Sequence, residues 1–159
     1  DGGATWTEVS GNVPGLAPGT YVSRITASRR GAGVAYATFD AHRDGDLGAY
    51  VYRSDDFGAS WTPLHTGLPA GSANVIVEHP DNPDVLFLGT EHAAFASTDA
   101  GRSWTRITNL TTTAYDDMVI DVVSAVNGRL GRGGLSLARA GAVVRWPPRP
   151  WPPAGCRTE

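Results

Sequence analysis

Ser54-Asp55-Asp56-Phe57-Gly58-Ala59-Ser60-Trp61 and Ser97-Thr98-Asp99-Ala100-Gly101-Arg102-Ser103-Trp104 are two copies of one pattern, S-x-D-x-G-x-x-W. The first residues, Asp1-Gly2-Gly3-Ala4-Thr5-Trp6, fit the last six positions of the same pattern. The tryptophans of successive copies are 55 and 43 residues apart. A repeat of about 40–50 residues is typical of the four-stranded blade of a β-propeller. The sequence therefore predicts an array of blades, and we expect a chain that begins within a copy to be a piece of a longer array.

The fixed positions of this pattern have structural roles. The glycine can take a positive φ in a tight hairpin turn, and the aspartate can accept backbone N–H groups across that turn. The tryptophan can bury a large apolar face against the neighbouring sheet. We therefore expect the repeated residues to stabilise the fold and not to take part in catalysis. The predicted structural set is Asp1, Gly3, Trp6, Ser54, Asp56, Gly58, Trp61, Ser97, Asp99, Gly101 and Trp104.

Short runs rich in Val, Ile, Tyr, Phe and Thr, bounded by Gly, Pro, Asn and Asp, lie between the copies and are typical of strands. They predict one blade over 21–64 and a second over 73–108, with an incomplete blade over 1–9 and the start of another over 117–126. The expected strands are Tyr21–Ala27, Val34–Phe39, Ala49–Ser54, Trp61–Leu64, Ala73–Glu78, Val85–Gly89, Ala93–Ser97 and Trp104–Thr108, with Trp6–Val9 and Asp117–Val123 in the partial blades. No helical apolar period is sustained. The sequence thus predicts an all-β fold, a partial β-propeller of four-stranded antiparallel blades within residues 1–126.

Composition excludes several kinds of protein. Cys156 is the one cysteine, so no disulfide can form within the chain, and no apolar run is long enough to span a membrane. Residues 1–126 carry seven Arg against fifteen Asp and Glu, and such an acidic body argues against nucleic acid as a partner. No P-loop, dinucleotide fingerprint or metal-ligand spacing occurs, so we expect no cofactor and no metal.

Residues 127–159 differ in composition from the rest of the chain. They carry six Arg against one Glu, and five of the eleven prolines lie in Trp146-Pro147-Pro148-Arg149-Pro150-Trp151-Pro152-Pro153. No further copy of the repeated pattern appears where one is due. We expect a degenerate Gly/Arg/Pro-rich tail, either disordered and polyproline-like or translated out of frame from a GC-rich gene.

The repeated pattern resembles the Asp-box of BNR (bacterial neuraminidase) repeats. These repeats occur in sialidases, sortilin-type receptors, xyloglucanase-like glycoside hydrolases and plant photosystem II assembly factors. Because those families do unrelated things, the resemblance implies the repeat and its fold rather than an activity.

Residues 1–120 also resemble a narrower group, large secreted bacterial BNR-repeat proteins described as sortilin-like or glycosyl-hydrolase-like. The resemblance implies a propeller and a secreted or periplasmic location. The group has a further blade with a Gly-Thr-His-Gly-Arg-like strand, which this chain lacks after Ile120. The matching stretches include Val22-Ser23-Arg24-Ile25, Ala37-Thr38-Phe39-Asp40-Ala41-His42-Arg43, Tyr50-Val51-Tyr52-Arg53-Ser54, Asn74-Val75-Ile76, Asp81-Asn82-Pro83, Leu88-Gly89-Thr90-Glu91 and Tyr115-Asp116-Asp117-Met118-Val119-Ile120.

The geometry of a propeller places the candidate binding residues. Successive turns of a four-stranded up-and-down blade alternate between the two faces of the propeller, so all repeated turns lie on one face, the turn face. Ligand sites in propellers gather at the mouth of the central channel, and we expect them on the opposite face, the loop face. The loops of that face are Ser10–Thr20, Asp40–Gly48, Thr66–Ser72, Thr90–His92 and Asn109–Asp116.

One of these loops is rich in charged groups. Asp40, His42, Arg43, Asp44 and Asp46 lie within seven residues. Two carboxylates about 5–10 Å apart would suit acid/base work at a sugar, with Asp40, Asp44 and Asp46 as catalytic candidates. The spacing also weakly resembles a calcium loop, but the bidentate Glu that such a loop needs is missing. The third interpretation is a solvated polar loop.

Other candidates lie on the same face. Glu91 and His92 close the corresponding turn of the second blade, either facing the charged loop around the channel or exposed as a simple turn. Asp116, next to Asp117, begins the third blade, and crowding of like charges there could raise one pKa. We expect His42, Arg43, Glu91, His92 and Asp116 to be binding residues if the face takes a ligand.

Two functions of different classes fit this sequence. The first is a binding or scaffold module that contacts a protein, a peptide or a glycan. The alternative is part of a xyloglucanase- or sialidase-like glycoside hydrolase, although a sialidase arginine triad cannot be assigned from the seven arginines of residues 1–126.

The coding DNA tests the hypothesis that residues 127–159 are out of frame. If they are, one of the two other reading frames should encode a blade that contains the missing copy of the repeated pattern. Sequencing the gene checks this, and two alternative frames without such a blade would exclude a shifted frame.

Overall fold

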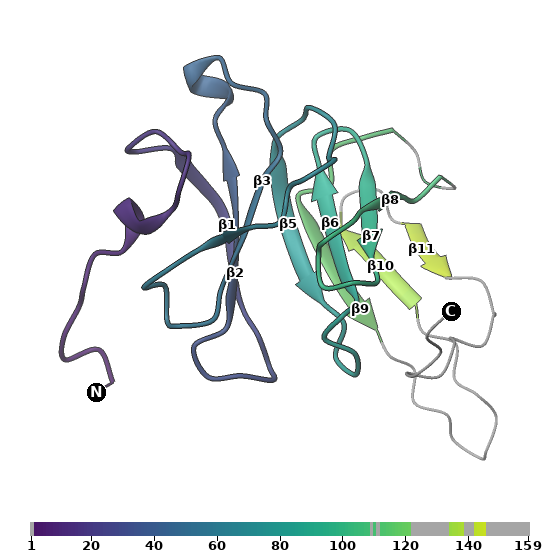
Figure 1. Cartoon of the computed structure of the whole chain (residues 1–159). Coiled ribbons are helices and arrows are strands. Elements are labelled where there is room, and N and C mark those ends of the chain that lie inside the picture. Colours follow the sequence, from purple (N-terminus) through teal and green to yellow (C-terminus); the bar gives the residue numbers. More distant parts are fainter. Residues whose placement is uncertain (1, 109, 111, 122–133, 139–141, 146–159) are drawn as a thin grey trace, which may run out of the picture.

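The computed structural model describes residues 2–108, 110, 112–121, 134–138 and 142–145, which form three antiparallel sheets (Figure 1). The first sheet holds β1 (Tyr21–Ala27), β2 (Ala35–Asp40), β3 (Tyr50–Ser54) and β4 (Thr62–Pro63). The second holds β5 (Ala73–Glu78), β6 (Leu86–Thr90), β7 (Ala94–Ser97) and β8 (Thr105–Arg106). The third holds β9 (Asp117–Asp121), β10 (Gly134–Ala138) and β11 (Ala142–Arg145). Two 3₁₀ turns, η1 (Ser10–Asn12) and η2 (His42–Asp44), lie in loops.

The first two sheets confirm the all-β prediction. Each has its strands in sequence order, so each is an up-and-down sheet of four antiparallel strands. β1 and β5 have the expected bounds, and the other strands of these sheets lie within one or two residues of them. The fourth strands are only two residues long, because the chain leaves the ladder soon after each repeated turn.

The N-terminal segment differs from its expected structure. No strand forms over residues 6–9, and Trp6 is 90 % exposed instead of packing on a sheet. A fourth strand needs a third strand beside it to complete its hydrogen bonds. No such third strand lies among the residues that the structure describes.

The third sheet includes part of the stretch expected to be degenerate. β10 pairs with β9 and with β11, and both β10 and β11 lie within residues 127–159. The alternation of Leu135 and Leu137 with small residues is the local pattern of a strand. The proline-rich residues 146–159 lie outside the described residues, as do residues 122–133, and the shifted-frame hypothesis stays a prediction.

The repeated turns share one backbone conformation. The φ angles of the two central residues are 59° and 85° in Phe57-Gly58, 59° and 88° in Ala100-Gly101, and 65° and 89° in Gly2-Gly3. Two successive residues with positive φ reverse the chain tightly between antiparallel strands. The larger angle of the second position, 85–89°, is one that glycine adopts without strain, which explains the fixed glycine of the pattern.

A common set of hydrogen bonds closes both complete turns. Gly58 N donates to Ser54 Oγ (2.8 Å), while Ser60 donates to the two carboxylate oxygens of Asp56 through its N (2.8 Å) and its Oγ (2.6 Å). The turn of residues 97–104 repeats these three bonds at 2.8, 2.9 and 2.6 Å. The Ser and Asp of the pattern therefore accept hydrogen bonds from backbone and hydroxyl donors of their own turn. The sequence pattern leads us to expect the backbone bond of the aspartate, but not the role of the serine.

Apolar layers join the sheets, because side chains alternate across each strand. In β6, Leu86 and Leu88 face the first sheet while Phe87 faces the third. The layer between the first and second sheets consists of Tyr36, Val51, Leu64, Ala73, Ile76, Leu86, Leu88, Ala93 and Phe95. The layer between the second and third consists of Val75, Val85, Phe87, Ala94, Ala96, Ile107, Tyr115 and Met118.

A smaller apolar cluster lies on the other side of the first sheet. Its buried members are Ala37, Phe39 and Tyr52, and Val13 and Leu16 pack against them from the segment that precedes β1. The hydroxyl of Tyr52 also donates to Pro14 O (2.8 Å) in that segment.

Leu64, three residues after Trp61, links the first sheet to the second. Its carbonyl accepts a hydrogen bond from Trp104 Nε1 (2.6 Å), and its side chain covers Gly101 so closely that an added Cβ would lie 2.8 Å from Leu64 Cδ1. The tryptophan and glycine of one repeated turn thus hold the end of the preceding sheet.

The N-terminal segment reproduces half of this link. Val9 stands three residues after Trp6 and covers Gly58, where an added Cβ would lie 3.2 Å from Val9 Cγ2. Trp61 Nε1 is buried, yet it finds no hydrogen-bond acceptor among the residues that the structure describes.

Replacing Trp104 and Trp61 separately with Phe should lower the free energy of unfolding by unequal amounts. The Trp104→Phe variant loses a hydrogen bond to a carbonyl that stays partly buried, and we expect it to lower the free energy of unfolding by about 1–2 kcal/mol. The Trp61→Phe variant removes a buried donor that has no acceptor, so we expect little loss beyond that of ring area. Urea unfolding followed by circular dichroism measures both, and equal losses would contradict this account.

Candidate functional site

The two faces of the molecule are arranged as the alternation of turns predicts. On the turn face, each repeated turn meets the hairpin between the first two strands of its own sheet, through Phe57 N to Gly33 O (2.9 Å) and Ala100 N to Asp84 O (2.8 Å). The loops that the sequence singles out lie at the other ends of the strands, where β2 ends in Asp40 opposite Tyr21 of β1.

Asp40 is the centre of the charged loop. Its carboxylate accepts hydrogen bonds from Ser72 Oγ (2.6 Å) and from the backbone N of His42 (3.0 Å), and it lies 2.6 Å from His42 Nδ1. Ser72 comes from the connection between the first and second sheets, so this carboxylate joins two loops of the loop face.

The surroundings of Asp40 keep it ionised. Burial by itself raises the pKa of this carboxyl, but the hydrogen bonds from Ser72 and His42, together with the charge that His42 can carry, outweigh burial and lower the pKa below its usual value. A carboxylate held in this way is a good hydrogen-bond acceptor and a poor general acid at neutral pH.

The other charged groups of the loop turn outward or toward their own chain. Asp46 accepts hydrogen bonds from Tyr50 OH (2.5 Å) and Gly48 N (2.8 Å), and these bonds lower its pKa. The guanidinium of Arg43 lies over the ring of Tyr21, 5.4 Å from its centre. Asp44 is exposed at the end of η2. Asp40 and Asp46 therefore bond to different partners, and the catalytic role of Asp40, Asp44 and Asp46 stays a prediction.

Glu91 and His92 lie beside the charged loop. Glu91 N donates to Ser72 O (3.1 Å), and Gly71 N donates to Leu47 O (2.7 Å), so the connection between the sheets bridges the two loops. His92 packs against Gly71, where an added Cβ would lie 3.2 Å from the imidazole, and its Nε2 is 3.9 Å from the carboxylate of Glu91. The connection between the sheets thus places Glu91 and His92 next to the charged loop, and their part in binding stays a prediction.

Asp116 belongs to a separate group nearer the centre of the molecule. Its carboxylate accepts from Asn74 Nδ2 (3.2 Å), and its carbonyl accepts from Arg24 NH2 (3.0 Å). Arg24 also pairs with Asp117 at 3.2 Å. The crowding of like charges that the sequence suggests is thus relieved by an arginine from the first sheet.

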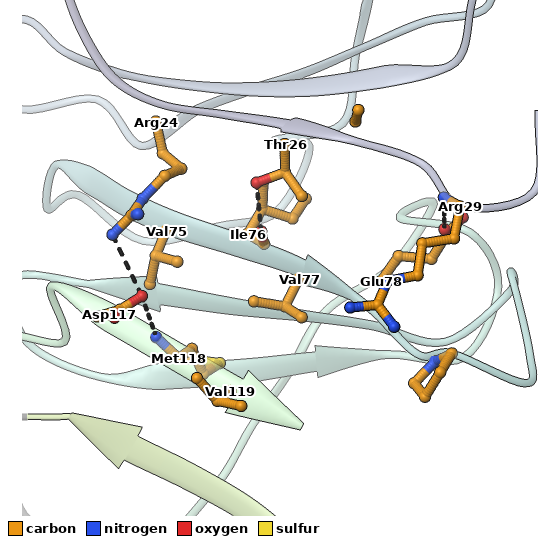
Figure 2. Close-up of a pocket in the computed structure, with 12 residues that line it drawn as sticks. Arg24, Thr26, Arg29, Val75, Ile76, Val77, Glu78, Asp117, Met118 and Val119 are labelled. Carbon is orange, nitrogen blue, oxygen red and sulfur yellow. Dashed lines mark hydrogen bonds and ion pairs between the residues drawn. The ribbon is translucent and has the colours of Figure 1, made fainter. Parts of the chain in front are cut away.

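A groove of about 270 Å³ lies among the first strands β1, β5 and β9 (Figure 2). Arg24 and Asp117 lie at one part of it, and Arg29 and Glu78 at another, with Val75, Val77 and Val119 between. Sequence reasoning did not single out Arg24, Arg29 or Glu78. Their places on the first strand of a blade, or directly after it, could have indicated them, since first strands line the axis of a propeller.

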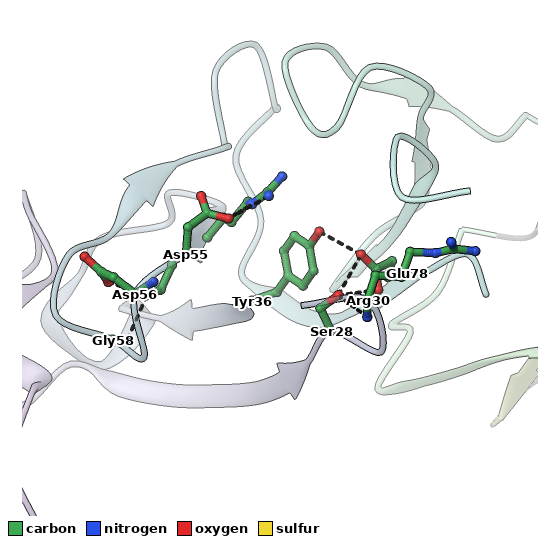
Figure 3. A network of polar contacts seen from close by, with 9 residues as sticks. Ser28, Arg30, Tyr36, Asp55, Asp56, Gly58 and Glu78 are labelled. Atoms are coloured by element: carbon green, nitrogen blue, oxygen red, sulfur yellow. Dashed lines mark hydrogen bonds and ion pairs between the residues drawn. The ribbon is translucent and has the colours of Figure 1, made fainter. Parts of the chain in front are cut away.

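Glu78 ties the first two sheets together at the turn-face end (Figure 3). Its carboxylate accepts from Ser28 Oγ (2.8 Å) and from the hydroxyl of the buried Tyr36 (3.2 Å). Burial, and then the charge of Glu78, raise the pKa of Tyr36 to about 12. The phenol therefore stays protonated and donates to Glu78 over the whole physiological pH range.

Catalytic and metal-binding arrangements are limited in the part of the chain that the structure describes. No group of three or more His, Cys, Asp and Glu side chains there could hold a metal ion. Ser72 and His42 both bond to Asp40 and not to each other, so they do not form a nucleophile and its base.

Comparisons with known proteins bear on the fold. No protein-family model matches the chain. It is 40 % identical over 55 residues to the vacuolar protein sorting/targeting protein 10 of Mycosarcoma maydis, and 30 % identical over 90 residues to the protein of the same name from Verticillium alfalfae. These matches cover 34 % and 55 % of this chain but 4 % and 6 % of the relatives, so the chain spans a small part of their length.

The crystal structure of the GH74 enzyme of Niastella koreensis is similar over 76 % of this chain and 20 % of that one, with a TM-score of 0.56 and 23 % sequence identity. At this sequence identity the structural similarity indicates the fold alone. The chain is a partial β-propeller. Its first and second sheets are four-stranded blades, and the third sheet has three strands among the described residues. Among the described residues, no helix is long and apolar enough to cross a membrane.

Replacing Ser72 with Ala should change how the stability of the first blade depends on pH. The pKa of the Asp40 carboxyl is lower in the folded chain than in the unfolded chain, where it is 3.8. Such a group stabilises the fold at a pH above its unfolded pKa, and this stabilisation is lost as the pH falls through the folded pKa. The variant should therefore be less stable at neutral pH and lose less stability on acidification. Urea unfolding across this pH range measures it, with Thr66→Ala, at an exposed position of the same connection between the sheets, as control. Parallel profiles for the wild type and Ser72→Ala would contradict the role of Ser72.

Proposed function

We propose that this chain is part of an Asp-box (BNR-repeat) β-propeller that acts as a binding or scaffold module for a protein, a peptide or a glycan. The observation that carries the proposal is the state of the candidate carboxylates. Asp40 and Asp46 each accept hydrogen bonds that lower their pKa, and those bonds come from neighbouring loop residues. Such carboxylates suit the recognition of donors on a ligand.

The loop face offers a surface for such a ligand. His92 and His42 are substantially exposed, and Arg43, Asp44 and Glu91 supply charges of both signs around them. The hydrogen bonds through Ser72 hold the loops in a fixed arrangement before any ligand arrives, which lowers the entropy cost of binding. The names of the sorting/targeting relatives favour a protein or peptide as the ligand.

The alternative is a part of a glycoside hydrolase, and the likeness to the GH74 enzyme favours it. Glycoside hydrolysis needs one carboxylic acid with a raised pKa beside a second, ionised carboxylate. Among the described carboxyl groups of the loop face, those whose pKa is shifted, Asp40 and Asp46, have a lowered pKa. Neither of them therefore suits the role of the acid. If the chain is part of a hydrolase, the acid would therefore be a residue other than Asp40 and Asp46.

We also propose that the protein works outside the cytoplasm, in a secreted or periplasmic setting. The resemblance to secreted BNR-repeat proteins supports this location. The likeness to sorting/targeting proteins agrees with it.

Binding screens with matched variants test the proposed function. The labelled chain should bind members of a peptide or glycan array, and Arg43→Glu combined with His92→Ala should weaken that binding at least about tenfold, since they remove charge and contact from the proposed surface. Arg102→Glu, on the turn face, serves as the control and should leave binding unchanged.

Activity assays on β-glucans and sialosides distinguish the alternative. We expect no turnover by this chain. Turnover that Asp40→Asn, Asp44→Asn or Asp46→Asn abolishes would contradict the binding module and support the hydrolase.

A further inference from the structure

The first and second blades present the same strand positions to very different surroundings. β1 carries a bulge at Ser23, after its second residue, and β5 carries the equivalent bulge at Asn74, after its first residue. This common register makes Val22 equivalent to Ala73, and Ile25 equivalent to Ile76. Ala73 and Ile76 are fully buried against the first blade, whereas Val22 and Ile25 are 40 % and 64 % exposed. We call Val22 and Ile25 the open face of the first blade.

Hydrogen bonds between the first two blades show what a neighbour supplies at these positions. Thr38 Oγ1 donates to Asn74 O (3.3 Å), and Thr26 Oγ1 donates to Ile76 O (3.1 Å). The equivalent acceptors on the open face are the carbonyls of Ser23 and Ile25. Hydroxyl groups on the first and second strands of a neighbouring sheet would therefore meet this backbone.

Residues 6–9 of this chain already supply the last part of such a neighbouring blade. Val9 covers Gly58 as Leu64 covers Gly101, and Leu64 is the residue that closes the first blade. Val9 therefore takes the position that closes a preceding blade. Trp6, three residues earlier, is 90 % exposed, although its counterparts Trp61 and Trp104 are partly buried.

We propose that the open face of the first blade, together with Trp6, is the docking surface for the first three strands of a preceding blade built on the same repeat. Residues 6–9 become the fourth strand of that blade. The partner brings apolar side chains against Ile25 and Val22, and hydroxyl donors to the carbonyls of Ser23 and Ile25. A second copy of this chain fits less well. Residues 6–9 already take the place of the fourth strand of the preceding blade, so only its first three strands, in sequence order, are still to be supplied.

A chain extended with its own repeat tests this proposal. Residues 65–98 of this chain, which include β5, β6 and β7, are fused directly before Asp1, so that Ser97-Thr98 runs into Asp1-Gly2-Gly3-Ala4-Thr5-Trp6 and restores the full pattern. Both the original and the extended chain carry the substitutions Cys156→Ser and Ile25→Cys, and the reaction of the introduced thiol with a soluble reagent is timed.

The proposal predicts a clear difference between the two chains. The thiol introduced by Ile25→Cys should react freely in the 159-residue chain and at least about tenfold more slowly in the extended chain, because a docked blade must open before the reagent can enter. The Trp6 fluorescence should shift to shorter wavelength in the extended chain. The matched control Ile76→Cys should be protected in both chains.

Four results would overturn the proposal. The first is protection of the Ile25→Cys thiol in the 159-residue chain, since its own residues would then cover the open face. The second is protection that rises with chain concentration, since a second copy would then be the occupant. The third is an extended chain that resists proteolysis but leaves the thiol reactive. The fourth is an extension that stays sensitive to protease, since a blade of this repeat would then not dock.

Discussion

A leucine held between the glycine and the tryptophan of the next repeated turn is the contact on which the rest of the structure depends. Leu64 is nearly buried, and burying such a side chain contributes roughly 1.5–3 kcal/mol. Because Gly101 has no side chain, the leucine can approach its backbone, and the bond from Trp104 Nε1 fixes the carbonyl of the same residue. The turn therefore closes its own hairpin and also sets the distance to the preceding sheet. The position of every loop at the opposite ends of the strands follows from that packing.

The two faces of the propeller consequently differ in what they can do. On the turn face, Asp56 and Asp99 accept bonds from donors within their own turns, and Glu78 accepts bonds from the first blade. On the loop face, Ser72 and Asp40 hold neighbouring loops in place but leave imidazoles and charged groups at the surface. A surface of this kind suits the binding of a partner, which is the function that we propose, whereas a hydrolase would need a carboxylic acid with a raised pKa. The groove among the first strands adds charged groups of both signs at the axis.

The sequence predicts the blades because each one repeats local chemistry that a short window contains. The glycine with positive φ and the bonds that Ser54 and Ser97 accept from Gly58 N and Gly101 N arise within eight residues, so a short window of sequence contains all their partners. The partners of Asp40 and of Arg24 could not, since Ser72 and Asp117 approach them only when separate blades pack. The same reason explains Trp6. Its pattern is that of a buried tryptophan, but burial requires a neighbouring sheet that the pattern does not contain.

A double-mutant cycle between Gly101 and Leu64 tests the central claim most directly. Gly101→Ala, Leu64→Ala and the double variant are compared with the wild type by urea unfolding. If the glycine serves to admit the leucine, Gly101→Ala should cost about 1–2 kcal/mol less in the Leu64→Ala background than in the wild type. The 2.8 Å contact of the added methyl group with Leu64 Cδ1 is then gone, and only the contact with the Cβ at position 64, at 3.3 Å, is left. Gly45→Ala, at a positive φ with open space around it, should show no such coupling to Leu64→Ala. Additive losses at Gly101 and Leu64 would contradict the claim that the repeated turn holds the preceding sheet.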